Sequence, residues 1–311
     1  MGHDNSAMTT SLAGIAPLSQ LGVIRAIGEE AAHFLQGQLT QDFALLGMDE
    51  ARFCAFCSAK GRMQASFVGF KRSPTEILLI CSRDLLAPTL KRLSMFVLRA
   101  KVKLDDASAL FRMAGLAGSS FMPEALARAE PWSKVDQAQA SWVLLYPADG
   151  VARALWIAPI DQPLPAGAAL SEALWQWGEV RSGIAGISAP MAEALVPQML
   201  NYESVGGVNF KKGCYPGQEI VARSQFRGTL KRRAYIVHGD SEMQAGQEVF
   251  EAADPSQPCG LVALAAASPH GGWDAIVSMQ IAAAKGRLSL GAADGAALTL
   301  QPLPYPLLAD I

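Results

Sequence analysis

The chain carries its densest motif at residues 211–219, which read KKGCYPGQE. Proline followed by glycine is typical of a type II turn, because Pro216 fixes φ at the second position and Gly217 accepts the positive φ of the third. Gly213 and two lysines precede Cys214, whereas a packed cysteine needs apolar neighbours. We therefore expect the stretch to present the thiol of Cys214 at the surface; a core cysteine beside an ordinary turn is the alternative.

The residues around Cys214 predict a reactive thiol. Nearby basic side chains favour the thiolate, and a helix that begins at Gln218 would add the positive end of its dipole. Cys214 is therefore the candidate catalytic residue of the chain. The loop and electrostatic support is expected from Lys211, Lys212, Gly213, Tyr215, Gly217, Gln218, Glu219 and Arg223.

Basic residues continue past this motif and predict an anionic ligand. Residues 211–233 hold seven basic residues and one acid, Glu219, which gives a local excess of +6 (7 − 1). Phosphate, a nucleic acid or a carboxylate would suit such an excess, and a solvated charged face is the other interpretation. The seven are Lys211, Lys212, Arg223, Arg227, Lys231, Arg232 and Arg233.

Towards the N-terminus, the first hundred residues predict an α+β unit in the order β-α-β-β-β-α-β. Two β-prone runs flank the segment 58–61, where Gly61 supplies the turn, so they predict a hairpin. Asp84 is expected to cap the second helix. The expected strands are 21–27, 53–57, 63–70, 76–81 and 102–104, and the expected helices begin at Glu29 and Asp84.

The rest of the chain predicts two further units. Residues 107–167 are rich in Ala, Pro and Gly and contain strand-like runs, which indicate a second lobe followed by a helix over 170–180. After Arg233, short β-like runs alternate with Gly and Pro turns and predict a small antiparallel barrel or sandwich. Those runs are 234–238, 248–250, 260–265, 275–281 and 298–300.

Composition bounds the class of protein. Half of the 311 residues are hydrophobic and 17% are charged, which excludes intrinsic disorder. The formal charge of 26 − 28 = −2 argues against a dedicated nucleic-acid binder, so any basic site must be local. Residues 1–11 are polar and no stretch of about 18 apolar positions follows, so we expect neither export nor membrane spanning, and a cytoplasmic location. Phosphate-loop, dinucleotide-binding, nucleophile-elbow and zinc-protease motifs are absent from the sequence.

The five cysteines form an odd, sparse set, which predicts reduced thiols instead of a disulfide framework. Cys54 and Cys57 have the C-x-x-C spacing of a redox pair or of half a zinc site. They lie in an expected strand, where positions i and i+3 face opposite sides. We therefore expect two packed thiols and no metal site.

Several motifs together resemble the YgfZ-type folate-binding proteins, relatives of the glycine-cleavage T-protein that support iron–sulfur cluster assembly or repair. The segment 212–219 resembles the signature of that family, and 34–42 (FLQGQLTQD) its N-terminal motif. The segment 60–62 resembles the family's hairpin turn, 99–102 (RAKV) its helix-to-strand junction, and Pro197-Gln198 the residues before the cysteine loop. With the expected C-terminal barrel, the resemblance covers nearly the whole chain.

The resemblance implies an α+β, T-protein-like ring of three domains with ferredoxin-like units, around a central folate channel. The implied domains are 1–106 (folate-binding), 107–230 (a second lobe that ends in the cysteine loop) and 231–311 (the barrel). It also implies tetrahydrofolate or a derivative as cofactor, iron–sulfur proteins or assembly factors as partners, and a role in tRNA modification through iron–sulfur enzymes. The folate-binding candidates that it gives are Gln38, Thr40, Arg62, Arg99 and Gln198.

Two other functions remain open. A true aminomethyltransferase is disfavoured because the T-protein has a pair of aspartates where this chain has Ala65 and Ser66, and nothing from 51 to 75 is acidic. Without that carboxylate, a general acid–base contribution of typically 10²–10⁴-fold is missing, so turnover is uncertain. An RNA-binding module that uses the basic run 211–233 is the alternative of another class, although the net charge makes direct nucleic-acid binding unfavoured.

Overall fold

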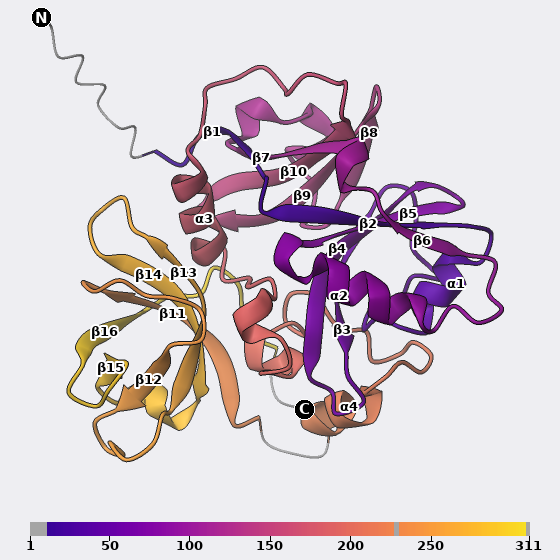
Figure 1. The fold of residues 1–311 in the computed structure, drawn as a ribbon. Coiled ribbons are helices and arrows are strands. Elements are labelled where there is room, and N and C mark those ends of the chain that lie inside the picture. Colours follow the sequence, from indigo (N-terminus) through magenta and orange to yellow (C-terminus); the bar gives the residue numbers. More distant parts are fainter. Residues whose placement is uncertain (1–10, 227–229, 309–311) are drawn as a thin grey trace, which may run out of the picture.

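The computed structural model describes residues 11–226 and 230–308. Arg227 of the basic run lies outside the described residues. In the described part of the chain, no helix is long and apolar enough to cross a membrane. Three β-sheets, each with its own helices or turns, lie around a common centre (Figure 1).

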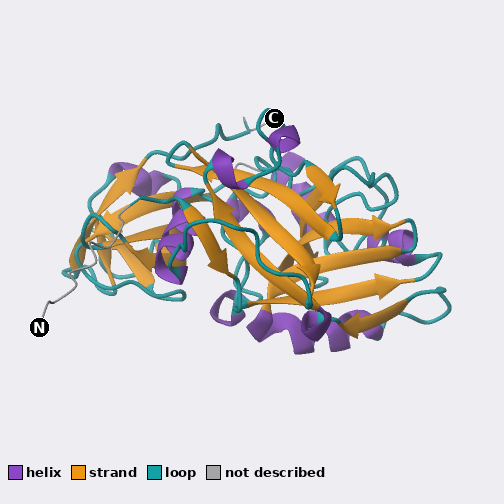
Figure 2. Ribbon diagram, turned by 90° about the horizontal axis from the view of Figure 1, so that it is seen from above, coloured by secondary structure: helices purple, strands orange, loops and turns teal. Residues whose placement is uncertain are grey.

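The N-terminal sheet has the strand order β3-β4-β5-β2-β6 and is antiparallel. Its chain order β2-α1-β3-β4-β5-α2-β6 confirms the order expected from the sequence. Figure 2 shows helices lining the outer side of the molecule beside this sheet. The elements are β2 Leu21–Ile27, α1 Ala31–Gln36, β3 Ala51–Cys57, β4 Met63–Ser73, β5 Glu76–Ser82, α2 Arg83–Ser94 and β6 Lys103–Asp106.

The alternation of side chains along these strands separates two cores. Cys54 and Phe56 face α1 and α2, in a cluster with Leu35 and Leu86. Phe53 faces the other way, into the core shared with the rest of the molecule. The first sheet is therefore buried on both faces, one against its helices and one against the centre of the ring.

The cap of α2 differs from the expectation. Ser82 is the N-cap residue, and Asp84 lies in the first turn of the helix. The Asp84 carboxylate instead accepts a hydrogen bond from the backbone N–H of Ala189 at 2.9 Å. A long-range partner has thus taken the carboxylate that local sequence assigns to the cap.

The second sheet has the order β1-β7-β10-β9-β8. Its strand β1 comes from the N-terminal segment, which the sequence places in the first unit: Gly14 lies opposite Ala117 in an antiparallel pair. The chain therefore passes through the second sheet before it enters the first. The strands are β1 Gly14–Pro17, β7 Phe111–Ala117, β8 Lys134–Gln137, β9 Ala140–Ala148 and β10 Val151–Pro159.

Helix α3 (Glu172–Arg181) joins the second sheet to the barrel. Ser171 caps it by accepting the N–H of Leu174 at 3.2 Å. Trp177 donates its indole N–H to Asp274 of the barrel at 2.7 Å, and both side chains are buried. The short 3₁₀ helices of the chain are Ser108–Leu110, Ser119–Phe121, Glu124–Leu126, Ala189–Met191, Pro197–Leu200 and Ala282–Lys285.

The C-terminal strands close into a six-stranded antiparallel barrel in the order β11-β14-β13-β12-β15-β16. This confirms the α+β fold with a terminal barrel. Strand β15 was not expected from the sequence. The strands are β11 Arg232–Gly239, β12 Glu248–Glu251, β13 Gly260–Ala267, β14 Trp273–Gln280, β15 Leu288–Leu290 and β16 Ala296–Gln301.

The segment that carries the cysteine motif returns to the first sheet. Thr40 donates its hydroxyl to the carbonyl of Gly207 at 2.7 Å and accepts the N–H of Ala55 at 2.9 Å. Helix α4 (Gln218–Phe226) follows the motif, and in Figure 1 it lies beside the turn between β3 and β4. The motif belongs to the second unit in sequence, but it packs on the first.

Candidate functional site

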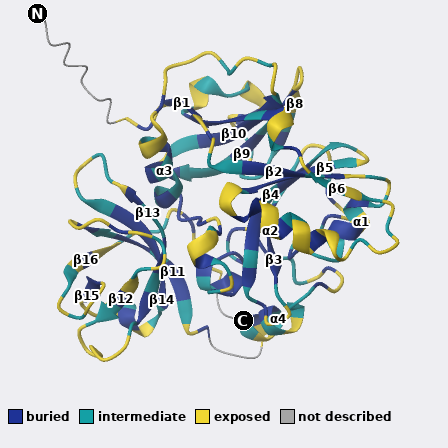
Figure 3. Ribbon diagram, viewed as in Figure 1, coloured by how far each residue is buried: buried dark blue, intermediate teal, exposed yellow. Residues whose placement is uncertain are grey.

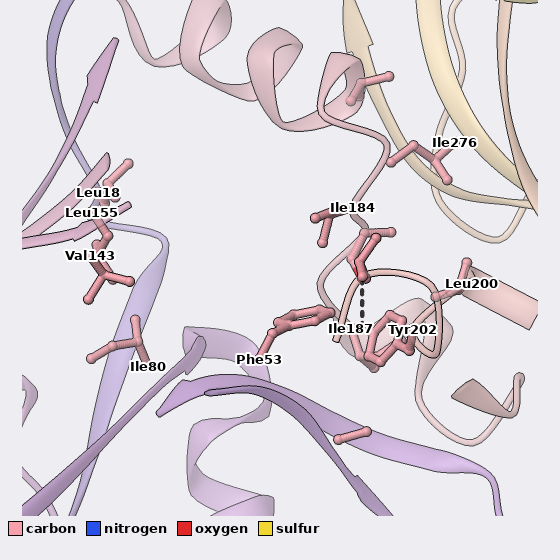
Figure 4. Close-up of a cluster of buried hydrophobic side chains, with 14 of the residues drawn as sticks. Leu18, Phe53, Ile80, Val143, Leu155, Ile184, Ile187, Leu200, Tyr202 and Ile276 are labelled. Atoms are coloured by element: carbon pink, nitrogen blue, oxygen red, sulfur yellow. Dashed lines mark hydrogen bonds between the residues drawn. The ribbon is translucent and has the colours of Figure 1, made fainter. Parts of the chain in front are cut away.

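A cavity of about 370 Å³ lies where the three sheets meet. The first sheet contributes β3, β4 and β5, the second sheet β9 and β10, and the barrel contributes Leu264 and Ala265 of β13. Figure 4 shows the side chains that face this centre: Leu18, Ile80 and Leu155 lie on one side, and Phe53, Ile184 and Ile187 on the other. All three parts of the ring are therefore needed to build the cavity.

Stacked aromatic rings form one wall of this cavity. Phe53 and Trp132 are parallel within 6° at a centroid distance of 5.2 Å, and Tyr146 meets Trp132 at 5.8 Å. Trp132 adopts a positive φ of 74° and donates its indole N–H to the carbonyl of Val205 at 2.9 Å. A bulky residue in this backbone region is strained, so the contacts of its ring must hold it there. The wall is thus an apolar group of packed aromatic rings.

A polar part of the lining, which we call the polar end, adjoins the aromatic wall, since Arg153 donates to the carbonyl of Tyr146 at 3.5 Å. Arg153 has a side chain only 2% exposed, pairs with Glu179, and lies over the ring of Trp175 at 4.4 Å. Its Nε and the Oε1 of Gln20 are buried without a hydrogen-bond partner among the described residues. A buried polar atom without a partner is costly, so this end of the cavity has unused capacity to bind a polar ligand.

Ala65 and Ser66, the positions where the resemblance implies aspartates in the T-protein, lie on opposite faces of β4. Ala65 packs towards the helices, whereas Ser66 lines the cavity and accepts the N–H of Ile187 at 2.8 Å. Among the described lining residues, Glu179 is the one carboxylate, and Arg153 holds it. The cavity thus presents a neutral hydroxyl at residue 66.

The cysteine motif folds as its sequence predicts. The N–H of Gln218 donates to the carbonyl of Tyr215 at 3.1 Å, and Gly217 has φ +80°, which closes the expected type II turn. A Cβ at residue 217 would lie 2.4 Å from the carbonyl oxygen of Ser58 and 2.7 Å from the Cα of Gly61. The two glycine turns, one in the motif and one in the β3–β4 hairpin, are therefore in direct backbone contact.

Lys212 holds the motif from inside. Its side chain is buried, its ammonium group donates to the carbonyl oxygens of Gln36 and Leu39, at 2.6 Å for Leu39, and it lies 4.7 Å from the ring centre of Tyr215. Burial lowers the pKa of Lys212 to about 8. Two carbonyl dipoles and an aromatic face compensate the charge that burial makes unfavourable. Lys212 thus anchors the loop to the end of α1, which the sequence did not indicate.

The other two basic residues expected to support the thiol, Arg223 and Lys211, are both exposed. Arg223 is exposed and forms an ion pair with Glu219, one helical turn before it, at 2.7 Å. Part of its charge is therefore neutralised within α4. Lys211 is exposed, and its backbone N–H donates to Asn209 at 2.8 Å.

Cys214 differs from the other four cysteines in exposure. Cys214 is exposed, whereas Cys54, Cys57, Cys81 and Cys259 are buried. Burial raises the pKa of Cys57 and Cys81 to about 12, and it raises the pKa of Cys54 and Cys259 as well. Cys54 and Cys57 pack in different cores, as their spacing in a strand predicts, and no group of three His, Cys, Asp or Glu in the described chain could hold a metal ion.

The five folate-binding candidates do not line the cavity. Thr40 and Gln198 are buried and bond to backbone carbonyls, Gln198 to that of Val221 at 2.7 Å. Arg62 donates to the carbonyl of Ala194, and Gln38 is half-buried with an unpartnered Oε1. Arg99 is exposed after α2. Thr40, Arg62 and Gln198 therefore tie neighbouring segments together, and the motif 211–219 does not border the cavity either.

The structure also divides the basic run 211–233. Arg233 and Glu203 form a buried ion pair at 2.6 Å. Arg232 donates to the carbonyl of Cys259 at 3.0 Å, and Lys212 is occupied by the carbonyls at the end of α1. The local excess of +6 in sequence is therefore not one anion-binding surface.

Sequence reasoning missed the polar end of the cavity. The signal for Arg153 was a single charge inside the apolar strand Val151–Pro159, where a buried partner is required. Glu179 and Gln20 carry no comparable signal, because they lie in segments of mixed polarity. The cavity is formed by residues that are distant in sequence, and no local pattern marks them.

Comparisons with known proteins agree with this architecture, although no family model matches the chain. The tRNA-modifying protein YgfZ of Edwardsiella ictaluri is 31% identical over 300 residues, covering 91% of this chain and 89% of that protein. The tRNA-modifying protein YgfZ of Photobacterium profundum is 31% identical over 258 residues, covering 72% and 69%. The solved structure of glycine cleavage system aminomethyltransferase T from Bartonella henselae shares the fold with a TM-score of 0.70, at 13% identity over 95% of this chain and 87% of that one. The chain therefore belongs to the YgfZ family.

Proposed function

We propose that this protein binds tetrahydrofolate, or a related folate, in the central cavity and supports iron–sulfur cluster assembly or repair. Through iron–sulfur enzymes it would serve tRNA modification, the activity in the names of its relatives. The observation that carries the folate part is the cavity itself, built jointly by three sheets. Cys214 would be the reactive thiol of the second part.

The lining of the cavity fits a folate in its chemistry. A pteridine is an aromatic ring system with a polar edge, and the cavity offers aromatic side chains at Phe53 and Trp132. The polar end offers the carboxylate of Glu179 beside Arg153, with an unpartnered acceptor on Gln20. A volume of about 370 Å³ lies in the range of small-molecule sites, which is about 300–1,000 Å³. We expect the ring system inside and the glutamate tail outside.

The position of Cys214 suits a role separate from the cavity. The thiol is exposed on a loop that Lys212, Gly217 and Gly61 fix against the first sheet. A fixed and exposed thiol can be reached by another protein, and the motif 211–219 does not line the cavity. The folate site and the thiol would therefore act as two sites on one rigid unit.

Calorimetric titration with tetrahydrofolate tests the first part of the proposal. Tetrahydrofolate at 100 times its dissociation constant should also raise the free energy of unfolding by about 2.7 kcal/mol. Val68→Trp fills the cavity from β4 and should abolish the binding heat. Val135→Trp is the matched control, because Val135 is half-buried on β8 outside the cavity. No heat with wild-type protein, or equal heat with both variants, would reject the cavity as the folate site.

A second candidate function is methylene transfer, and Ser66 argues against it. The hydroxyl at this position accepts a backbone N–H and offers no carboxylate to manage a proton. The chain shares the fold of an aminomethyltransferase but offers no carboxylate at this position. Formation of methylenetetrahydrofolate from an aminomethyl-lipoyl donor would reverse this conclusion.

A further inference from the structure

The end of α2 and its connection to β6 form a basic surface that the proposed function does not use. Residues 91–103 contain five basic residues and no acid. All five are exposed, and Figure 3 shows the outward side of α2 as exposed. They are Lys91, Arg92, Arg99, Lys101 and Lys103. In a chain with a formal charge of −2, this is a local concentration of positive charge.

Exposed apolar side chains lie between these charges. Leu98 is 86% exposed, Met95 67% and Phe96 42%. Ile27, on the neighbouring strand β2, is 39% exposed and lies opposite Lys103 in the register. A cluster of large apolar residues exposed on the surface of a protein usually marks an interaction site. We call residues 91–103 with Ile27 the α2–β6 surface.

Few internal partners neutralise this surface. Lys101 lies 3.4 Å from Glu29, in a pair that is about three-quarters exposed and so contributes little. Within the described residues, the side chains of Lys91, Arg92, Arg99 and Lys103 form no ion pair or hydrogen bond. Its connection is nevertheless fixed, since the backbone N–H of Lys101 donates to Glu30 at 2.6 Å.

The contrast with the run 211–233 is informative. There, Lys212 and Arg233 are buried and have internal partners, and Arg223 pairs with Glu219. The basic run that looks stronger in sequence is thus largely used within the fold. The α2–β6 surface keeps its cations in solvent.

We propose that the α2–β6 surface docks an RNA. Lys91, Arg92 and Lys103 would contact phosphates, and unpaired bases would pack on Phe96 and its apolar neighbours. The positive charge of this surface complements the phosphate backbone of an RNA, and its apolar side chains suit bases that are not paired. Tetrahydrofolate binding is a separate property of the cavity, so either proposal can fail without the other.

Fluorescence anisotropy with labelled bulk bacterial tRNA tests this proposal between about 50 and 200 mM salt, where phosphate contacts weaken most visibly. Three phosphate contacts at about 0.7 each give a slope of log Kd on log salt of about 2. Lys91→Gln with Arg92→Gln should lower that slope by about 1.4. Phe96→Ala should weaken binding about fivefold or more without changing the slope, as lost base stacking does.

Two controls make the outcome decisive. Lys285→Gln with Arg287→Gln removes two exposed charges from the barrel and should leave tRNA binding unchanged. Each variant should keep the wild-type Tm and its heat of tetrahydrofolate binding, which separates docking from folding and from the cavity. Equal loss in both double variants would overturn the proposal. So would a lack of tRNA binding together with binding to vesicles of phosphatidylglycerol and phosphatidylcholine, which would assign the surface to lipid.

Discussion

Replacing Gly217 by alanine should break the contact between the cysteine loop and the β3–β4 hairpin. Gly217 has φ +80°, and a Cβ there would lie 2.4 Å from the Ser58 carbonyl oxygen and 2.7 Å from both the Cα and the N of Gly61. These are backbone atoms of a tight turn, in which the Gly61 N–H donates to Ser58 at 2.9 Å. They cannot rotate away as a side chain could.

The size of the effect follows from three contributions. A left-handed backbone costs an alanine about 1–2 kcal/mol, and the close contacts add about 1–3 kcal/mol as overpacking does. The lower entropy of the unfolded chain returns about 0.4–1 kcal/mol. We therefore expect the free energy of unfolding to fall by about 1–5 kcal/mol. Should undocking of the loop cost less than this, the loop will leave the hairpin and the loss will stop at the docking energy.

Gly213→Ala is the matched control, since it is the same substitution four residues earlier on the other side of Cys214. Gly213 has no positive φ, and a Cβ there meets nothing within 4 Å. Its effect on stability should stay within about 0.5 kcal/mol. Urea unfolding measures both variants, and amide exchange in the turn 58–61 reports undocking.

Equal stability of the two alanine variants would refute the predicted clash between residue 217 and the hairpin. That prediction also fails if Gly217→Ala lowers stability without faster exchange in the 58–61 turn, because the strain would then not act on the hairpin. Gly61→Ala offers an independent check from the other side. A Cβ at Gly61 would lie 2.9 Å from the Cβ of Ile220 in α4.

Three further predictions concern the thiol, the lysine and the cavity wall. At neutral pH, mass spectrometry should find that Cys214 is alkylated before the four buried cysteines. Cys214→Ala should change the free energy of unfolding by no more than about 1 kcal/mol, yet it should fail to complement an iron–sulfur enzyme defect. Slowest labelling of Cys214 together with full complementation by the variant would make this cysteine structural. Burial lowers the pKa of Lys212 to about 8, so between about pH 8 and 10.5 the unfolded chain binds more protons than the folded chain. The stability of the wild type relative to Lys212→Met should therefore rise across that window, by no more than about 3 kcal/mol. A fall in denaturant titrations would contradict the burial of this lysine. Ser66→Asp should not create methylene transfer, since positioning and other contacts must also match, and turnover by this single variant would show that the carboxylate alone was missing.

Local sequence was sufficient for the order of elements in the first unit and for the turn of the cysteine loop. The spacing of apolar residues gave the order of the first unit, and Pro216 with Gly217 gave the turn, because each depends on residues that are neighbours in the chain. The same approach assigned Asp84 to a helix cap, and the structure gives its carboxylate to Ala189 instead. A local preference predicts correctly until a distant group competes for the same atom.

The folate candidates show where sequence reasoning ends. Thr40, Arg62 and Gln198 stand in the segments that resemble the family's motifs, yet they bond to backbone carbonyls and do not line the cavity. A resemblance marks which residues matter but not whether they contact a ligand or position another group.

Charge illustrates the same limit in the opposite direction. A run of basic residues was read as an anion site, but burial decides whether a cation is available, and burial is a property of the fold. Arg233 pairs with Glu203, and Lys212 donates to two backbone carbonyls. The basic side chains of 91–103 remain exposed. A binding surface therefore depends on the charged side chains that stay exposed and are not paired within the fold. These side chains can be identified only after the internal partners of each charge are known.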